Sequence, residues 1–439
     1  METILRKIRK MIPEKLFTAL QPAYHYTLAF VGAVIYRFPS RELNVVFITG
    51  TKGKSSTTEI LTAILEGAGK KVANLGTIRF KIGEKVRPNL HKMTVPGRFF
   101  VQKFLREAAD AQCEYAIIEM TSQAAVQFRH KFISMNALLF LNISPEHIES
   151  HGGFDKYLEA KLSLAKALEH SSKRPRIIVV NGDDPNHHKF LEITAEEKYA
   201  FTLSDSEPYL TDHFGVYISY RGKNLRSHLQ GTFNIYNILA ALTYASTQGI
   251  SPDVAQIGLE KLTGIAGRVQ KITLEPSNPL AKKQDFNVVV DYAHTADSLS
   301  KIYGVFNDSK KICVLGNTGG GRDKWKRPAM GKVANDNCSH IILTNEDPYD
   351  EDPTQILKDM LPGITSTPYE IILNRREAIH KAIKLATTLR QAQGNNNVTV
   401  IITGKGTDPY IMEANGKKTP WSDAKVAQEE LEKVLAGKK

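Results

Sequence analysis

The run Gly50-Thr51-Lys52-Gly53-Lys54-Ser55-Ser56 decides how this chain is interpreted. It follows an apolar stretch, residues 44–49, and precedes a helical pattern, so it connects a strand to a helix. Its glycines let backbone N–H groups face a polyphosphate, and the positive end of the helix adds to the attraction. Lys54 supplies a charge and Ser55 can reach a bound magnesium ion, so residues 50–56 predict an ATP site.

The run departs from the general eight-residue phosphate-loop pattern, which has glycine where Ile48 stands. An ordinary glycine turn between strand and helix is the alternative interpretation. That alternative does not explain a lysine followed by two hydroxyl side chains, and we therefore retain ATP and Mg²⁺ as the expected cofactors.

The composition is that of a multidomain globular protein, because 439 residues with 42% hydrophobic and 24% charged residues can bury two or three cores. The 58 Lys and Arg residues exceed the 46 Asp and Glu residues, which gives a net charge of +12. This excess suits anionic small molecules, nucleic acid or an acidic membrane surface. The chain has no basic block with interleaved aromatic residues and no nucleic-acid motif, so we expect no nucleic-acid partner.

The three cysteines predict a cytoplasmic protein. Cys113, Cys313 and Cys338 are odd in number, widely spaced and embedded in apolar stretches. This pattern is typical of reduced thiols in a core, and it indicates no cysteine metal site.

The N-terminal arm, residues 1–43, is expected to be helical. Its first residues combine apolar side chains at helical spacing with Arg6, Lys7, Arg9 and Lys10, which predicts a basic amphipathic helix. A second apolar stretch, residues 28–36, is too short to span a bilayer, and no signal-peptide cleavage site follows. Residues 1–36 therefore either pack on the next domain or contact a membrane surface or a lipid-linked substrate.

Short β-branched runs alternate with helical patterns, which predicts an α/β fold with parallel sheets. A central ATP-binding domain of P-loop type is expected over residues 44–272, and a C-terminal Rossmann-like domain over residues 273–439. The polar segment 275–284 is the expected hinge, and a helical stretch at 234–262 closes the central domain. The runs expected to form strands are 44–49, 115–119, 137–142, 176–181, 287–290, 311–315, 340–343 and 398–402.

Polar residues follow these runs, where open α/β sheets bind ligands. Glu119 is placed to bind magnesium, with His147 as a helper ligand. Asp291 could hold a ribose hydroxyl, and Arg268 could meet a phosphate with its bidentate fork. Lys161 lies in a helical run in which a solvated lysine is the default interpretation.

Motifs between residue 44 and about residue 430 carry a resemblance to a known family. They are GTKGKSS at 50–56, Thr94-Val95-Pro96, Glu119 with Thr121-Ser122, Asn142 with His147, Tyr157 with Ala160-Lys161, Gly231, Phe233-Asn234, Tyr236-Asn237, Gly267-Arg268, DYAHT at 291–295, Arg322-Asp323, KRP at 326–328, Met330-Gly331 and GKG at 404–406. With these motifs in this order, the chain resembles the Mur ligases, and within them the branch that adds the third residue of the peptidoglycan stem peptide. Folate-polyglutamate synthetases share the loop and the architecture, but DYAHT and KRPAMG look like the muramyl branch.

The resemblance implies ATP-dependent amide ligation in peptidoglycan precursor synthesis. The carboxylate of a muramyl peptide would take the γ-phosphoryl group, and the amine of an amino acid would displace phosphate from the acyl phosphate. Lys161 would be carbamylated and would become a magnesium ligand beside Ser55, Glu119 and His147, with Lys54 and Arg268 completing the catalytic set. The residues implied to bind ATP beyond the loop are Asn234, Asn237, Arg268, Asp291 and His294. The residues implied to bind substrates are Thr94, Pro96, Thr121, Ser122, Arg129, Arg322, Asp347, Tyr349, Gly404 and Asp408.

The chain also departs from the family pattern. Family members carry about a hundred residues before the loop, which hold uridine diphosphate, whereas 49 residues precede Gly50 here. We therefore expect the usual nucleotide-sugar domain to be absent. Either the arm replaces it poorly, a partner supplies it, or the acceptor is not a free UDP-linked muramyl peptide, and our hypothesis is a lipid-linked or unlinked acceptor. Diaminopimelate-adding members have an arginine in place of Tyr349 and a His-Glu pair in place of Thr407-Asp408. The added amino acid, diaminopimelate, lysine or another, stays open, as do the oligomeric state and the role of the arm.

Two rival interpretations stay open at this point. One is a ligase for folate or another carboxylate acceptor. The other is a non-catalytic nucleotide-binding relative, although such a protein would not need Lys54, Glu119, His147 and Lys161 together.

Overall fold

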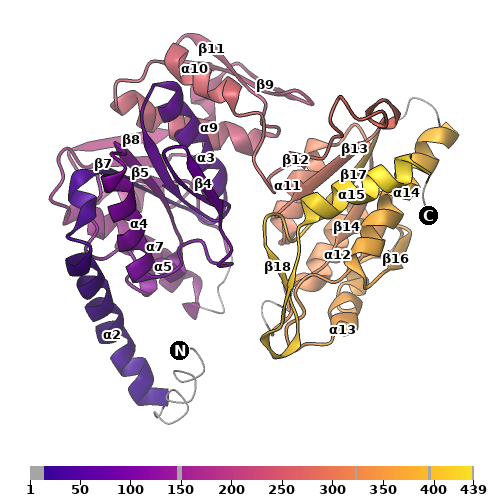
Figure 1. Cartoon of the computed structure of the whole chain (residues 1–439), viewed down its shortest axis with the longest axis horizontal. Helices are drawn as coiled ribbons and strands as arrows, with labels where there is room; N and C mark the ends of the chain where they lie inside the picture. The colour runs from indigo at the N-terminus through magenta and orange to yellow at the C-terminus, as the bar shows by residue number, and fades with distance from the viewer. Residues whose placement is uncertain (1–13, 146–150, 322–323, 394–396, 438–439) are drawn as a thin grey trace. The chain divides into compact units, whose positions relative to one another are not determined.

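The computed structural model describes residues 14–145, 151–321, 324–393 and 397–437 of the chain (Figure 1). The chain forms two compact units. The first unit comprises Met1–Pro208, Ile218–Leu225 and Ile235–Lys261, and the second unit comprises Tyr209–Tyr217, Arg226–Asn234 and Leu262–Lys439. Both units contain sheets with helices packed on them, which confirms the predicted α/β fold class with parallel-rich sheets.

The first unit is built on β1 (Asn44–Thr49), whose side chains are buried after the first residue. β1 pairs in parallel with β5 (Tyr115–Met120) on one side and with β6 (Ala137–Phe140) on the other. Continuous apolar runs are typical of strands that are covered on both faces, as in β1 and β6. The eight-stranded sheet has the order β4-β3-β2-β5-β1-β6-β7-β8. Its remaining strands are β2 (Val72–Leu75), β3 (Arg79–Ile82), β4 (Lys85–Pro88), β7 (Ile177–Asn181) and β8 (Glu197–Phe201).

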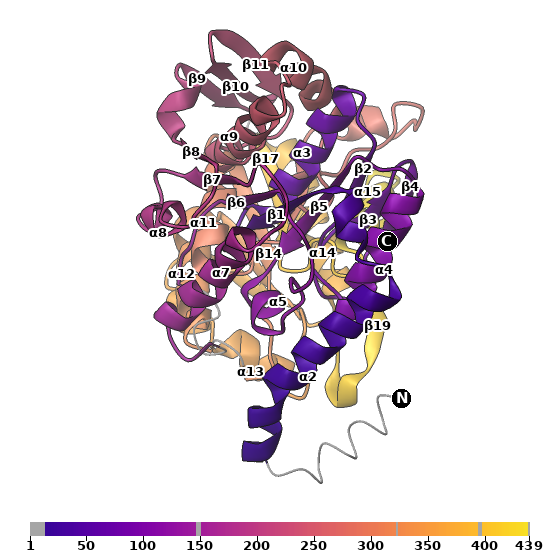
Figure 2. The same ribbon diagram turned by 90° about the vertical axis from the view of Figure 1, so that its left-hand side faces the viewer.

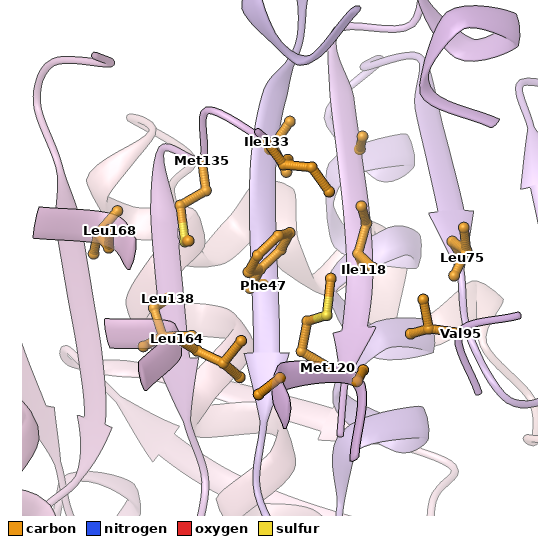
Figure 3. Close-up of a cluster of buried hydrophobic side chains, with 14 of the residues drawn as sticks. Phe47, Leu75, Val95, Ile118, Met120, Ile133, Met135, Leu138, Leu164 and Leu168 are labelled. Atoms are coloured by element: carbon orange, nitrogen blue, oxygen red, sulfur yellow. The ribbon is translucent and has the colours of Figure 1, made fainter. Parts of the chain in front are cut away.

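One apolar cluster of this unit lies on one face of the sheet (Figure 3). Phe47 of β1 lies between Ile118 of β5 and Leu138 of β6, and Leu164 and Leu168 of helix α7 (Phe154–Glu169) pack against the strands. Alternate strand residues point to this face, as the period of two requires. Each fully buried side chain of this size contributes about 1.5–3 kcal/mol, so the sheet is a rigid support for the loops at its carboxyl edge.

Helix α2 (Glu14–Ile35) precedes the sheet and packs on α4 (Arg98–Asp110), as Figures 1 and 2 both show. The helix expected over the first dozen residues lies outside the described residues, whereas most of the apolar stretch 28–36 is helical, within α2. No helix in the described part of the chain is long and apolar enough to cross a membrane. The other helices before residue 262 are η1 (Pro39–Glu42), α3 (Lys54–Gly67), α5 (Ser122–Val126), α8 (His187–Leu191), η2 (Leu203–Ser206), α9 (Thr232–Thr247) and α10 (Pro252–Lys261).

The second unit contains a six-stranded sheet with the order β12-β13-β17-β14-β15-β16. All of its neighbouring pairs are parallel except β12 with β13. Val288 and Val290 face one apolar cluster and Val289 faces the other, so the sheet is covered on both sides. The strands are β12 (Gln270–Lys271), β13 (Asn287–Asp291), β14 (Lys310–Leu315), β15 (His340–Leu343), β16 (Tyr369–Ile371) and β17 (Val398–Thr403).

All eight runs that the sequence assigned to strands are strands, and their observed ends differ from the expected ends by no more than two residues. The remaining elements are short or lie on the sheet faces. They are β9 (Tyr209–Asp212), β10 (Gly215–Tyr220), β11 (Lys223–Ser227), η3 (Ala281–Lys283), α11 (Ala296–Val305), α12 (Lys326–Asn337), α13 (Pro353–Lys358), η4 (Leu361–Gly363), α14 (Arg375–Gln393), β18 (Tyr410–Met412), η5 (Ala414–Gly416), β19 (Lys418–Pro420) and α15 (Asp423–Leu435).

The prediction of three reduced core thiols is wrong for two of the cysteines. Cys313 of β14 and Cys338, which follows α12, form a disulfide with a Cα–Cα distance of 6.1 Å. The two residues are 25 positions apart, and the packing of α12 against the sheet brings them together. Cys113 is a buried thiol, as expected.

Candidate active site

The phosphate loop, residues 50–56, connects β1 to α3 and has a preformed shape. Gly53 precedes the first turn of α3 with φ of 84°, and a Cβ at this position would collide with the side-chain oxygen of Asn237. Asn142, which follows β6, holds the loop from the other side. Its Oδ1 accepts the Lys52 N–H at 2.9 Å, and its Nδ2 donates to the Lys52 carbonyl at 3.1 Å. Glycine at 53 and the amide of Asn142 therefore fix the backbone that leads into the helix.

Two lysines meet at one carbonyl group of this loop. Lys54 Nζ donates to Gly50 O at 2.8 Å and to Thr51 O at 2.9 Å, and Lys161 Nζ donates to the same Gly50 O at 2.9 Å. Lys161 is 1% exposed and lies 4.8 Å from the centre of the Tyr157 ring. The tyrosine hydroxyl in turn shares a 2.9 Å hydrogen bond with Thr51 Oγ1. Lys161 is therefore part of the loop environment, and the default interpretation as a solvated lysine is wrong.

Glu119 of β5 is the carboxylate of this site, and it is 1% exposed. Ser55 Oγ donates to its Oε2 at 3.0 Å. Thr77 donates to it twice, from its backbone N–H to Oε1 at 2.8 Å and from its hydroxyl to Oε2 at 2.9 Å. β1 pairs with β5 so that Glu119 lies opposite Ile48, and Ile48 precedes the first residue of the loop, Gly50, by two positions. Strand register therefore brings Ser55 and Glu119 together, as the sequence predicted from their positions after neighbouring strands.

Thr77 is a site residue that the sequence did not reveal. Its hydroxyl also lies 2.9 Å from Thr94 Oγ1, so it links the Glu119 carboxylate to the segment that contains Thr94. A threonine in the turn between two short strands has no pattern that marks it. Only the folded sheet places it beside Glu119.

The turn that starts α5 contains Thr121 and Ser122. Thr121 caps the helix by accepting the Ala124 N–H at 3.1 Å, so its hydroxyl has a structural role. Ser122 Oγ lies 3.0 Å from His151 Nε2. Burial, and next the charge of Lys161, lower the pKa of His151. His151 was not predicted, although its spacing of four residues from His147 could have drawn attention to it, and His147 itself lies outside the described residues.

The segment around Thr94 and Pro96 meets the turn that follows α5. Pro96 is buried, and Arg129 Nη1 donates to the Val95 carbonyl. Nη2 of the same arginine donates to Gln127 Oε1 at 2.6 Å. Burial, and then the charge of Arg98, lower the pKa of Arg129 to about 10.

Three further residues of the expected ATP set are buried. Ser56 lies in the first turn of α3. Asn237 Oδ1 accepts a hydrogen bond from Thr57 Oγ1 at 3.3 Å, which places this amide against the loop helix. Asn234 Nδ2 donates to Gln230 O at 2.7 Å.

In the second unit, Asp291 closes β13 and is 9% exposed. Its two carboxylate oxygens accept the backbone N–H groups of Val269 and Ala293, each at 2.7 Å. Burial raises the pKa of Asp291, against the charge of Arg268 and these two hydrogen bonds. Asp291 thus fixes the turns on both sides of it.

Arg268 lies over the Tyr292 ring, with 4.5 Å between the guanidinium carbon and the ring centre. His294 Nδ1 lies 2.9 Å from the Tyr292 carbonyl oxygen. The negative charge of Asp408, followed by burial, raises the pKa of the Tyr292 hydroxyl. Tyr292 therefore lies between a cation and a group of carboxylates at the carboxyl edge of the second sheet.

The carboxylates at this edge surround Lys405, which is 0% exposed. Lys405 Nζ donates to the two oxygens of Asp347 at 2.8 and 2.9 Å, and to Tyr410 O at 2.7 Å. Asp408 Oδ2 lies 3.4 Å from the same nitrogen. Asp347 also accepts the Met412 N–H at 2.7 Å. Asp347, which the resemblance assigned to the substrate, is thus the partner of a buried lysine.

Glu346 follows β15 and is 3% exposed. Its Oε1 accepts the Thr318 hydroxyl at 2.7 Å, whereas its Oε2 is buried without a hydrogen-bond partner in the described structure. Gly404 has φ of 107°, and a Cβ there would collide with Oε2, so glycine makes room for this carboxylate. Tyr349 has φ of 52° and donates its N–H to Met412 O at 3.0 Å. Arg322, which the resemblance assigned to the substrate, lies outside the described residues.

The donor set of the first unit fits a nucleotide with its magnesium ion. The start of α3 offers backbone N–H groups, and the glycine at 53 leaves no Cβ in their way. Ser55 and Glu119 offer hard oxygen ligands of the kind that Mg²⁺ prefers. Among the residues that the structure describes, no three His, Cys, Asp or Glu side chains form a metal-binding group.

Comparison with known families decides the assignment. The model of the Mur ligase middle domain matches residues 48–245, and the model of the Mur ligase glutamate ligase domain matches residues 277–406. The chain belongs to the Mur ligase family. The phosphate loop, Glu119 and Lys161 lie in the first matched region, and Asp291, Glu346 and Lys405 lie in the second.

Individual relatives agree with this assignment. This Mur ligase is 33% identical over 427 residues to a UDP-N-acetylmuramoyl-L-alanyl-D-glutamate–2,6-diaminopimelate ligase of Syntrophomonas wolfei, a match that covers 93% of the chain and 82% of the relative. It is 35% identical over 404 residues to the ligase of the same name from Aquifex aeolicus, covering 90% and 78% of the two chains. A solved structure of a ligase with that name superposes with a TM-score of 0.59 and 26% identity, covering 89% of this chain and 78% of the other.

Membership confirms the predicted family and its ligase class. It disfavours the non-catalytic relative, since the names of the relatives are those of ligases. A Mycobacterium tuberculosis folylpolyglutamate synthase shares the fold with a TM-score of 0.66, but its 15% identity carries no argument about substrate.

Proposed function

We propose that this Mur ligase joins an amino acid to the carboxylate of a muramyl-peptide acceptor, at the expense of ATP and through an acyl phosphate. The observation that carries the proposal is the meeting of Lys54 and Lys161 at Gly50 O, next to the pair formed by Ser55 and Glu119. At this loop the charge of Lys54, together with that of a bound magnesium ion, would offset the charge of an anionic acceptor that approaches an anionic phosphate.

Within the first unit, residues 50–56 would hold the phosphates and Lys54 would contribute charge to the transferred group. Bound MgATP supplies the phosphoryl group that activates the acceptor carboxylate. Ser55, Glu119 and His147 would hold the metal ion, and Asn237 would support the loop from the start of α3. In the second unit, Asn234, Arg268, Asp291 and His294 complete the proposed nucleotide set.

Carbamylated Lys161 is the second part of the proposal. Reaction of the amine with CO₂ would replace a cation by an anion at the loop and would add an oxygen ligand for magnesium. The burial of Lys161 and its position at Gly50 O support this role. Incubation with ¹³C-bicarbonate is expected to give a carbamate carbon signal in nuclear magnetic resonance spectra. The Lys161→Ala variant should lack this signal, and an unchanged signal or full activity in the variant contradicts the assignment.

The acceptor would lie along Thr94, Pro96, Ser122 and Arg129. Thr121 would act through the helix that it caps. Thr77 and His151, which the sequence did not suggest, join this group because they contact Thr94 and Ser122 directly.

The incoming amino acid would bind at the carboxyl edge of the second sheet, near Glu346, Gly404 and Asp408. Lys405 is surrounded by Asp347, Asp408 and a backbone carbonyl, so it offers little to a distal carboxylate of the amino acid. Tyr349 brings no charge where an arginine would bind such a carboxylate. The unpartnered oxygen of Glu346 suits an ammonium group. We therefore propose a diamino acid without a distal carboxylate, such as lysine, rather than diaminopimelate.

A membrane surface is the proposed partner of residues 1–36. The outward side of α2 exposes Leu20, Tyr24, Val34 and Ile35, and no charged residue occurs between Lys15 and Arg37. Basic residues precede and follow this face, which suits an interface with anionic lipid. Val34→Glu should weaken co-sedimentation with anionic vesicles, whereas Ile257→Glu, at an exposed position of α10, should not.

One experiment tests the main proposal. The full chain is incubated with ATP, Mg²⁺, a panel of amino acids and free, nucleotide-linked and lipid-linked muramyl dipeptides, and the products are identified by mass. A muramyl tripeptide together with ADP is the expected outcome. If ADP forms only when folates are supplied, or if it forms with none of the muramyl acceptors, the assignment of the acceptor is overturned. Diaminopimelate used in preference to lysine overturns the assignment of the amino acid.

A further inference from the structure

Three basic side chains of the first unit, those of His25, Arg98 and Arg129, lie near one another outside the phosphate loop. His25 belongs to α2, Arg98 is the first residue of α4, and Arg129 and His130 follow α5. Nothing in the proposed role of the loop uses His25, Arg98 or His130. The three elements, labelled in Figures 1 and 2, come from segments far apart in the chain.

Contacts between these elements bring the group together. Arg129 donates to the carbonyl of Val95, three residues before Arg98. The ring of Tyr26, next to His25 in α2, lies 6.4 Å from that of Phe128. The Phe128 ring lies 6.5 Å from that of His130.

Six side-chain nitrogens of His25, Arg98, Arg129 and His130 are buried without a hydrogen-bond partner. Within the described part of the chain, the side chain of Arg98 and the rings of His25 and His130 form no hydrogen bond or ion pair. His130 is only 2% exposed. The buried nitrogens without a partner are His25 Nδ1, Arg98 Nε and Nη2, Arg129 Nε, and His130 Nδ1 and Nε2.

Other buried arginines of the protein are paired. Arg375 donates to both oxygens of Asp423, at 2.8 and 2.7 Å. Arg327 donates to Glu351 and to Asp359, each at 2.8 Å. Buried guanidinium groups are ordinarily compensated in this way because an unpaired buried charge is costly. The cluster of Arg98 and Arg129 is therefore an exception within this chain.

Electrostatic effects agree with this picture. Burial, followed by the charges of Arg98 and Arg129, lowers the pKa of His25. Burial lowers the pKa of His130 to about 3, with the charge of Lys131 as a smaller cause. The positive charges of Arg98 and Arg129 act on each other and on His25, so an anion at this place would relieve an unfavourable interaction.

The start of α4 adds a further attraction for an anion. The helix has 13 residues, and Gly97 at its N-cap provides no side-chain hydrogen bond to the first turn. Its N-terminal N–H groups carry the positive end of the helix dipole. Arg98 stands in that first turn, and so the dipole and the guanidinium favour the same kind of ligand.

We propose that His25, Arg98 and Arg129 form a binding site for the diphosphate group of the acceptor's carrier. One carboxylate carries too little negative charge to neutralise two permanently charged guanidinium groups. The adjacent donors Nε and Nη2 of Arg98 match two oxygens of a phosphoryl group. The inference rests on the proposed function for the identity of the acceptor, but the anion site itself does not depend on that function.

A diphosphate could come from a nucleotide or from a polyprenyl lipid. His25 and the apolar outer side of α2 belong to the same helix. A lipid-linked diphosphate and a nucleotide diphosphate can therefore both be tested at this site.

Isothermal titration calorimetry on the full chain tests the site directly. ADP is present at saturating concentration, so that the probe does not report the phosphate loop. The probes are inorganic pyrophosphate, uridine diphosphate and a short prenyl diphosphate below its micellar concentration. At least one probe is expected to bind, with a loss of tenfold or more in Arg98→Gln and a smaller loss in Arg98→Lys. Arg87→Gln removes an exposed arginine of the same unit and should bind like the wild type.

The tightest probe identifies the source of the diphosphate. Circular dichroism and ADP binding of each variant show that the unit is folded. Absence of binding by all three probes, or equal binding by the wild type and a folded Arg98→Gln variant, overturns the site. Failure of the ligase itself would appear differently, as Arg98-dependent pyrophosphate binding without any muramyl product.

Discussion

Replacement of Lys405 by methionine tests whether the second unit depends on its buried charge cluster. Lys405 is 0% exposed, and its ammonium group contacts Asp347, Asp408 and the Tyr410 carbonyl at 2.7–3.4 Å. Methionine has a similar length and keeps most of the apolar contacts, so the variant removes the charge and its hydrogen bonds with little change in volume.

The expected loss follows from what the variant leaves behind. The Asp347 side chain is 4% exposed and loses two hydrogen bonds to Lys405, while the side chain of Asp408 is 12% exposed and can regain some hydration. Breaking a buried ion pair from one side costs about 3–5 kcal/mol. Asp347 keeps the Met412 N–H, so we expect a value near the lower end, about 3 kcal/mol.

Tryptophan fluorescence during denaturation by urea measures this loss selectively. The chain has two tryptophans, Trp325 and Trp421, and both belong to the second unit. The matched control is Lys417→Met, whose side chain is 72% exposed and pairs with Glu413 at 2.6 Å. Exposed pairs contribute about 0–1 kcal/mol, so this control should be nearly neutral.

A double variant separates the pair from the fold. Asp347→Asn combined with Lys405→Met removes both charges, and it should be less destabilised than the sum of the single variants by about 1–3 kcal/mol. A Lys405→Met protein within 1 kcal/mol of the wild type, or strict additivity in the double variant, would refute the account of the cluster.

Three further predictions concern the first unit. Thr77→Val deletes the hydroxyl between Glu119 and Thr94 and should lower the free energy of unfolding by about 1–3 kcal/mol. Thr77→Ser keeps the hydroxyl and should not lower it. Equal thermal midpoints for the two variants would count against this link. Gly53→Ala forces φ of 84° on alanine and a collision with Asn237, so ADP affinity measured by calorimetry should fall at least tenfold. Gly69→Ala has φ of 76° with open space around it and should leave that affinity intact, and similar losses in both variants would exclude a steric cause. The pKa of His130 is about 3 in the folded protein, whereas its ordinary value, which applies to the unfolded chain, is near 6.5. As the pH falls, the unfolded chain therefore binds the proton first, and the free energy of unfolding decreases below pH 6.5. Between pH 7.5 and pH 5.5, in phosphate-free buffer, the wild type should lose about 1.4 kcal/mol more than His130→Leu by circular dichroism, and equal losses would show that His130 is protonated in the native state.

The strands and the loop could be predicted from the sequence because local patterns determine them. Runs such as 44–49 and 340–343 are apolar and β-branched, and they end at polar residues, so both their type and their carboxyl ends could be predicted. The approach of Ser55 to Glu119 followed from the general rule that strand ends meet at one edge of a parallel sheet.

Other features depend on packing between distant segments and have no local signal. Cys313 and Cys338 each look like a core thiol, and only the packing of α12 on the sheet brings them within bonding distance. Thr77 is an ordinary turn residue until β5 places Glu119 beside it. The ion pair of Asp347 had no local signal for the same reason, since its partner Lys405 is 58 residues away in the chain.

The cluster of His25, Arg98 and Arg129 shows why such a site requires the folded chain. In the sequence His25 and Arg98 have ordinary interpretations, as a core histidine and a surface cation, and no motif joins α2 to α4. Within the described residues, the fold brings these side chains together and no carboxylate pairs with Arg98. Buried arginines elsewhere in this protein have acidic partners, as Arg375 has in Asp423. An acidic residue placed beside Arg98 would stabilise the fold but would occupy the position of an anionic ligand. The guanidinium group of Arg98 therefore lacks an acidic partner among the described residues for the same reason that the site can bind a diphosphate.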